Sequence, residues 1–105
     1  MIHLGEFKIA LETALDGVVT DMNLSQTDNR WKVSAKKCTC WSKDQPVDIE
    51  LQQTDECIVM DVTQYFPQYG RAVTNSYNYS GEHFPVTTAE GFTKAWAEND
   101  KWDII

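Results

Sequence analysis

The hydrophobic pattern changes its period along this chain, from about 3.6 residues near the N-terminus to 2 residues from residue 30 onward. The first pattern is typical of a helix with one apolar face and comprises Leu4, Phe7, Leu11, Ala14, Leu15, Val18, Val19 and Met22. We therefore expect a helix over residues 4–22. Gly17 is expected to end it early or to kink it, because glycine costs a helix about 1 kcal/mol relative to alanine. The polar run 23–29 is expected to be a connector.

The period of 2 predicts strands. Apolar side chains alternate with polar ones from residue 30 to residue 36 and again from residue 47 to residue 52, and the turn-forming residues 42–46 join the two segments. These segments are predicted to form a hairpin. Lys37 interrupts the alternation, which favours either a bulge near Lys36 and Lys37 or the end of pairing there.

Two more strands and a second helix are expected further along the chain. The run 57–62 is apolar on both faces until Asp61 and is predicted to be the most buried strand. A loop marked by Pro67 and Gly70 leads to a fourth strand over 71–79. The run Thr87 to Glu90 fits a capping box, and the helix after it would turn Phe92, Ala95 and Trp96 toward the core.

These elements predict one α+β domain over residues 1–105. Its expected architecture is an N-terminal helix, a four-stranded antiparallel meander and a C-terminal helix, with a single layer of helices on one sheet face. A chain of 105 residues is long enough for one such core. No apolar stretch approaches the roughly 20 residues of a membrane span, and the N-terminus lacks the pattern of a secretion signal. A cytoplasmic protein without membrane contact is expected.

The formal charge of −7 is unevenly distributed. Residues 30–46 hold five of the nine Lys and Arg side chains and one acid, whereas 1–29 and 47–61 hold five acids each against a single lysine. We expect Lys32 and Lys36 to pair with Asp48 and Glu50 across the hairpin. The acids of the first helix and of the turn at 55–56 would then remain available to a partner.

The cysteines do not favour a metal site. Cys38 and Cys40 are separated by one residue, whereas paired zinc ligands are usually separated by two or more, so three reduced core cysteines that include Cys57 are the expected arrangement. No metal and no cofactor are predicted.

Catalysis is not expected either, although an alternative stays open. His3, His83 and Asp61 are the candidates for acid–base chemistry, since Asp61 ends an apolar run and His83 is next to Phe84. They match no nucleophile, metal or phosphate-binding motif. The alternative is an enzyme or a small-ligand-binding protein that uses Asp61, His83 or the cysteines.

A second alternative is a nucleic-acid-binding module that uses the basic hairpin 30–43, in which cations alternate with Trp31 and Trp41. The period of 2 places Trp31 opposite Arg30 and Lys32, toward the core, and the net charge repels phosphate. Nucleic acid is therefore an unfavoured partner.

The favoured hypothesis is a small acidic protein-binding module. It would be an inhibitor, of the immunity type or of the phage or plasmid anti-defence type, or an adaptor, and it would engage a basic partner such as a nucleic-acid-handling enzyme. The aromatic side chains of the loop 65–70 are expected to be exposed, because tyrosine is frequent at contact surfaces. The predicted partner-binding residues are Tyr65, Phe66, Tyr69, Glu12, Asp16, Asp21, Asp55 and Glu56.

Overall fold

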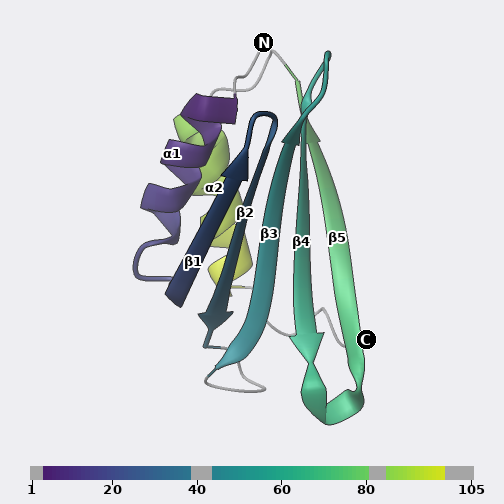
Figure 1. The fold of residues 1–105 in the computed structure, drawn as a ribbon. Coiled ribbons are helices and arrows are strands. Elements are labelled where there is room, and N and C mark those ends of the chain that lie inside the picture. Colours follow the sequence, from purple (N-terminus) through teal and green to yellow (C-terminus); the bar gives the residue numbers. More distant parts are fainter. Residues whose placement is uncertain (1–3, 39–43, 81–84, 99–105) are drawn as a thin grey trace.

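The fold is α+β: along the chain, one helix precedes an antiparallel meander and a second helix follows it. The computed structural model describes residues 4–38, 44–80 and 85–98. In these ranges, the elements follow one another as α1 (Leu4–Leu15), β1 (Val19–Thr27), β2 (Arg30–Lys37), β3 (Gln45–Gln53), β4 (Ile58–Phe66), the 3-10 turn η1 (Pro67–Tyr69), β5 (Arg71–Tyr79) and α2 (Pro85–Glu98) (Figure 1).

The sheet has five strands in the order β1-β2-β3-β4-β5, so the prediction of four strands was wrong by one. The additional strand is β1, which occupies the end of the expected helix and most of the expected connector. Helix α1 ends at Leu15, and Gly17 follows with a φ of 88°, a conformation that favours glycine. Residues Asn23 to Thr27 were not recognised as a strand because they are solvent-exposed and therefore show no alternation of apolar and polar side chains.

Each strand pairs antiparallel with its sequence neighbour. Of the two outcomes expected near Lys36 and Lys37, the end of pairing is confirmed and the bulge is not: β2 stays in register with β3 through the pair of Lys37 and Gln45, and the strand then ends. The register shift lies instead on β1, between Thr20 and Asn23, where Asp21 has a φ of 55°. A bulge of this kind adds a residue to one strand only.

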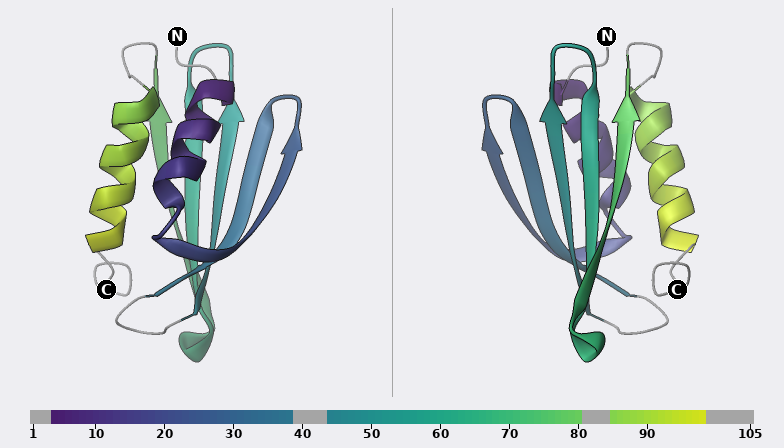
Figure 2. Two further views of the ribbon diagram at one scale, coloured as in Figure 1. Left: turned by 90° about the vertical axis from the view of Figure 1, so that its left-hand side faces the viewer. Right: turned by 90° about the vertical axis from the view of Figure 1, so that its right-hand side faces the viewer.

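Both helices pack against the same face of the sheet, as predicted (Figure 2). Helix α1 buries four side chains of the predicted apolar face, namely Leu4, Phe7, Leu11 and Leu15. Aromatic contacts join the helices to β5, since the Phe7 ring stacks on Tyr79 at 5.3 Å and the Phe92 ring meets Tyr77 edge-on at 5.5 Å. This packing covers one sheet face and leaves the other to solvent.

The second helix differs from the prediction in two details. It begins at Pro85, so Thr87 lies inside its first turn and not at a cap. Proline suits a first helical turn because its fixed φ is already helical and its missing amide has no partner there. Ala95, which was expected to face the core, is exposed. Ala89 and Thr93, one turn apart, are buried instead.

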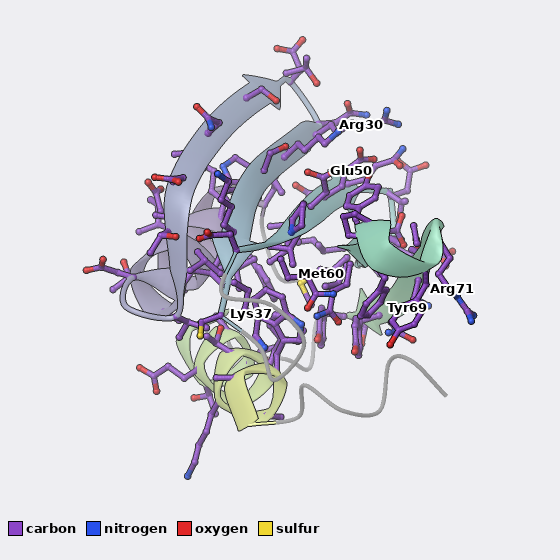
Figure 3. The ribbon with its side chains drawn as sticks, turned by 90° about the horizontal axis from the view of Figure 1, so that it is seen from below. Arg30, Lys37, Glu50, Met60, Tyr69 and Arg71 are labelled. Atoms are coloured by element: carbon purple, nitrogen blue, oxygen red, sulfur yellow. The ribbon has the colours of Figure 1, made fainter. Side chains whose placement is uncertain are left out.

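The end of the core nearest the β4–β5 turn is polar. Lys37, Gln45 and Gln64 are buried there, and the Lys37 Nζ lies 5.1 Å from the centre of the Trp96 ring. Figure 3 shows Lys37 directed toward α2, while Arg30 and Glu50 lie on the other side of the sheet. Lys37 thus keeps the alternation that its charge was expected to break, because its apolar stem and an aromatic ring accommodate it in the core.

Neither helix in the described ranges combines the length and the apolar character needed to cross a membrane.

Candidate protein-binding surface on the open sheet face

The sheet face opposite the helices is mostly polar, with Pro46, Val59 and Ala72 as apolar exceptions. Its side chains come from the alternate positions that point away from the core, and the register aligns them in rows across the sheet. One such row contains Lys32, Glu50, Asp61 and Ser76. Cations lie on β2 and carboxylates on β3 and β4, so charge is separated across this open face.

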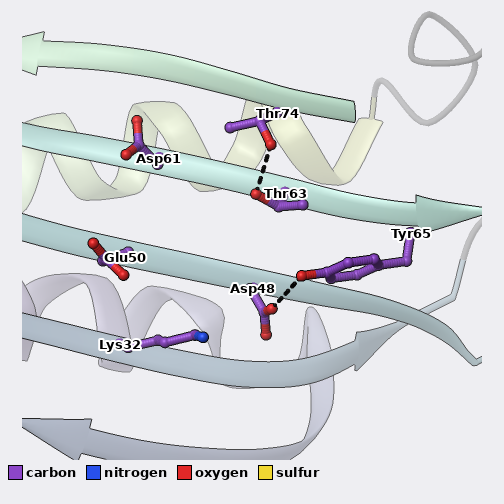
Figure 4. A pocket seen from close by; sticks show the side chains of 7 residues that line it. All are labelled: Lys32, Asp48, Glu50, Asp61, Thr63, Tyr65 and Thr74. Carbon is purple, nitrogen blue, oxygen red and sulfur yellow. Dashed lines mark hydrogen bonds between the residues drawn. The ribbon is translucent and has the colours of Figure 1, made fainter. Parts of the chain in front are cut away.

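A shallow hollow of about 200 Å³ lies in the middle of the open face (Figure 4). Three carboxylates, one cation, two threonines and a tyrosine line it, namely Lys32, Asp48, Glu50, Asp61, Thr63, Tyr65 and Thr74. They come from β2, β3, β4 and β5, so only the folded sheet brings them together. We call this feature the acidic hollow.

Hydroxyl groups hold two of the three carboxylates. The Tyr65 hydroxyl donates to Asp48 Oδ2 at 2.7 Å, and the Ser76 hydroxyl donates to Asp61 Oδ1 at 2.5 Å. These bonds fix the carboxylate orientations, but a hydroxyl carries no charge to neutralise them. Glu50 has a cationic neighbour, because its Oε1 lies 3.5 Å from Arg30 Nε.

The expected pairing across the hairpin is replaced by a different one. Lys36 pairs with Asp21 of β1, Nζ to Oδ2 at 3.7 Å, and not with Asp48 or Glu50. Lys32 is opposite Glu50 in the register, yet it forms no ion pair with the residues that the structure describes. Arg30 takes the Glu50 carboxylate instead, which leaves the Lys32 ammonium at the border of the acidic hollow.

Asp48 also changes the acidity of its neighbour. The pKa of Tyr65 is raised above the ordinary value of 10.0. The largest cause is the hydrogen bond that the phenol donates to the Asp48 carboxylate, followed by the partial burial of Tyr65 and then by the negative charge of Asp48. Tyr65 therefore stays protonated and remains a donor to Asp48 over the neutral range.

The predicted partner-binding residues are spread over the molecule. Tyr65 and Tyr69 are exposed near the β4–β5 turn, at 38% and 53%, whereas Phe66 between them is 1% exposed. The expectation of exposure was therefore wrong for Phe66, because β4 extends through residue 66 and its alternation turns this ring inward.

The predicted acids do not join these tyrosines. Asp16 and Asp21 flank the start of β1, at the opposite edge of the sheet from β5, and Glu12 is on α1. Asp55 and Glu56 lie in the β3–β4 turn, at the far end of the sheet from η1 (Figure 1). Of the predicted set, Tyr65 alone lines the acidic hollow.

The other candidate chemistries are also separated in space. Cys38 follows β2 at one end of the sheet and is exposed, so the expectation of a core position was wrong for it; Cys57 precedes β4 at the other end and is half-buried. Cys40, His3 and His83 lie outside the described residues. No group of three His, Cys, Asp or Glu side chains arranged to hold a metal ion occurs in the described ranges.

The basic hairpin places its charge and its aromatic ring on different faces. Trp31 is 3% exposed and packs in the core, while Arg30, Lys32 and Lys36 are on the open face beside carboxylates. Stacking of a base on Trp31 would require the core to open, and Trp41 lies outside the described residues.

The acidic hollow was only partly foreseen from the sequence. The end of an apolar run marks Asp61, and the charge pattern predicts an ion pair for Asp48, but no sequence signal marks Thr63, Thr74 or Ser76. The period of 2 alone places Asp61 and Thr63 on the solvent face of β4. Their approach to Asp48 and Thr74 depends on the strand register, which the sequence does not show.

Comparison with protein-family models, with curated proteins and with solved structures finds no match to this chain.

Proposed function

We propose that this protein is a small acidic binding module whose acidic hollow receives a basic side chain of a partner protein. The observation that carries the proposal is the convergence of Asp48, Glu50 and Asp61 beside the Tyr65 ring in an exposed hollow. Carboxylates form strong charge-assisted bonds with lysine and arginine, and an aromatic ring adds a favourable contact to a cation.

The contacts within the acidic hollow support this assignment. Within the ranges that the structure describes, Asp48 and Asp61 accept from hydroxyl donors and form no ion pair, so their charges remain available to an incoming cation. Glu50 forms an ion pair with Arg30 at 3.5 Å. An arginine of the partner can displace Arg30 from this carboxylate or bind beside it. The net charge of −7 would steer a basic surface toward the protein.

The volume of the acidic hollow favours a side chain over a separate small molecule. Small-ligand sites are commonly about 300–1,000 Å³ and mostly apolar, whereas this hollow measures about 200 Å³ and is polar and open. Asp61 keeps the small-ligand or enzyme alternative open, because it is the one residue of that hypothesis found in the hollow. Binding of a small molecule with the partner absent would favour this alternative.

The partner class follows from its charge. A basic protein that handles nucleic acid complements the acidic surface. The module would act on such a partner as an inhibitor, or it would serve as an adaptor that links the partner to another protein. The basic hairpin remains a weaker route to direct nucleic-acid binding, because carboxylates stand among its cations on the open face.

Capture from an extract of the native host tests the proposal. The bait is the wild-type protein, and the matched variant Asp48→Asn/Asp61→Asn removes two charges of the acidic hollow while keeping side-chain size. Asp55→Asn/Glu56→Gln is the control, since it removes two charges in the β3–β4 turn, away from the hollow. A basic protein retained by the wild type and the control, lost from the hollow variant and released by added salt is the expected result. Equal retention by the hollow variant would refute the proposed site.

A further inference from the structure

Strand β1 forms an outer edge of the sheet that no strand among the described residues pairs with. Between the bulge and the Asp28–Asn29 turn, Asn23 to Thr27 run in regular register with β2. All five side chains are exposed, and none of them is charged. An edge of this kind is a template for another strand, because charges, prolines and bulges that block such pairing are missing from these five residues.

We propose that two copies of this chain pair antiparallel through β1, with the twofold axis at Ser25. In this register Leu24 pairs with Gln26 of the second copy, Ser25 pairs with its own counterpart, and Asn23 pairs with Thr27. This register pairs all five regular residues with one another. The bulge ends the shared ladder on one side and the hairpin turn ends it on the other.

The side chains on the helix side fit such a seam. Leu24 is 47% exposed, and it lines a hollow of about 250 Å³ with Glu12, Gln26 and Trp31 at the border between α1 and β1. In the proposed register, Gln26 of the second copy is opposite Leu24, and the two Leu24 side chains are diagonal neighbours. Pairing would therefore extend the apolar layer beyond its present edge.

The charges beside β1 favour a second copy over an unrelated strand. Lys8 donates a hydrogen bond to Gln26, so it lies level with that residue. Glu12 follows Lys8 by one turn of α1. Because α1 runs antiparallel to β1, this turn brings Glu12 from the level of Gln26 to about the level of Leu24. A twofold axis at Ser25 thus places Lys8 of each copy level with Glu12 of the other. Asp21 and Asp28 fall outside the paired segment.

The pair would place two acidic hollows on one continuous open face, because a twofold axis perpendicular to the sheet preserves its sides. A partner with two basic segments could then engage both copies, and linked binding strengthens association without new contacts. The pairing itself does not depend on the function proposed for the hollow, since it involves a different surface.

Cross-linking tests the pairing and its register. With Cys38, Cys40 and Cys57 replaced by serine, Ser25→Cys places two thiols on directly opposite residues, about 4.5–5.5 Å apart between Cα atoms and within disulfide reach. Asn23→Cys is the matched control, because its two thiols are offset by four residues, about 13 Å along the strands. Under mild oxidation we expect a covalent dimer from Ser25→Cys and little from Asn23→Cys.

Sedimentation equilibrium supplies the second measurement. We expect a concentration-dependent dimer for the wild type and a monomer for Leu24→Lys, which places two like charges at the seam. Thermal unfolding checks that Leu24→Lys stays folded, as an exposed position should allow. A wild type that remains monomeric at all concentrations, or equal cross-linking of both cysteine variants, would overturn the proposal. A monomer whose β1 amides become protected only when another protein binds would show a different occupant and would overturn it too.

Discussion

The Tyr65 hydroxyl and the Asp48 carboxylate are joined across β4 and β3 by a hydrogen bond of 2.7 Å. The bond holds the tyrosine ring against the acidic hollow and raises its pKa above 10.0. No cation among the described residues forms an ion pair with Asp48. The two residues thus form the wall of a site that is both aromatic and negatively charged.

Asp48→Asn should lower the pKa of Tyr65 toward 10.0. The variant removes the carboxylate that accepts the phenolic proton and with it the nearby negative charge. Titration of the tyrosine rings by NMR measures the pKa, with Tyr65→Phe to assign the resonance. Asp61→Asn is the control and should leave the Tyr65 pKa raised. An unchanged Tyr65 pKa in Asp48→Asn would show that the hydrogen bond does not persist in solution.

Stability should fall at alkaline pH because of Tyr79. Burial, and next the neighbouring Tyr77, raise the pKa of Tyr79 from 10.0 to about 12. The folded state therefore keeps a proton that the unfolded chain loses, and the free energy of unfolding decreases as pH rises from about 10 to about 12. Tyr79→Phe should make that decrease smaller in denaturant unfolding at several pH values. An equally steep decrease in the variant would exclude Tyr79 as its origin.

Gln64→Met should stabilise the protein by about 1 kcal/mol. Gln64 is buried, and its Nε2 has no hydrogen-bond partner among the described residues, so a side chain of similar shape removes an unsatisfied donor. Gln45→Met is the comparison, since it would lose the bond from Gln45 Nε2 to the Tyr65 carbonyl. Urea unfolding measures both variants. A destabilised Gln64→Met would mean that this amide has a partner in solution.

Two glycines should respond to alanine in opposite directions. Gly17 has a φ of 88°, so Gly17→Ala should destabilise the fold by about 1 kcal/mol through backbone strain. Gly91 is inside α2 with open space around it, and Gly91→Ala should stabilise by about 0.5–1 kcal/mol because alanine is the better helix former. Thermal unfolding compares them. An unchanged thermal stability of Gly17→Ala would argue against a positive φ at Gly17 after the end of α1.

The sequence predicted the elements whose burial follows a clear period. Residues 30–36 and 47–52 alternate in the sequence, and the structure confirms a hairpin of β2 and β3 that contains them. The buried face of α1 was likewise predicted from Phe7 and Leu11. In each case an apolar face contacts the core, and burial imposes a repeat that can be counted.

The sequence failed where burial did not follow the chemical type of the residue. Asn23 to Thr27 form an edge strand with solvent around it, so no periodicity marks it. Lys37 is buried although its charge predicted otherwise, because the Trp96 ring, distant in sequence, covers it. Phe66 was assigned to an exposed loop because Pro67 follows it, yet the strand continues to that proline.

The acidic hollow could be predicted only in its parts. The solvent-facing positions of Asp48 and Asp61 follow from the strand period, but their approach depends on which residues of β3 and β4 are opposite one another. The exchange of ion-pair partners, with Lys36 on Asp21, depends in addition on the unforeseen strand β1.

The most direct test of the account is a chemical-shift titration of the protein with a short blocked peptide that contains two arginines. The account predicts that shifts concentrate on Asp48, Glu50, Asp61 and Tyr65, and that Asp61→Asn weakens binding about fivefold, the effect of roughly 1 kcal/mol expected of a partly exposed charge pair. A peptide with two glutamates should produce no such shifts. Shifts spread over α1 and the 55–56 turn, with the same affinity for wild type and Asp61→Asn, would contradict the assignment of the acidic hollow as the binding site.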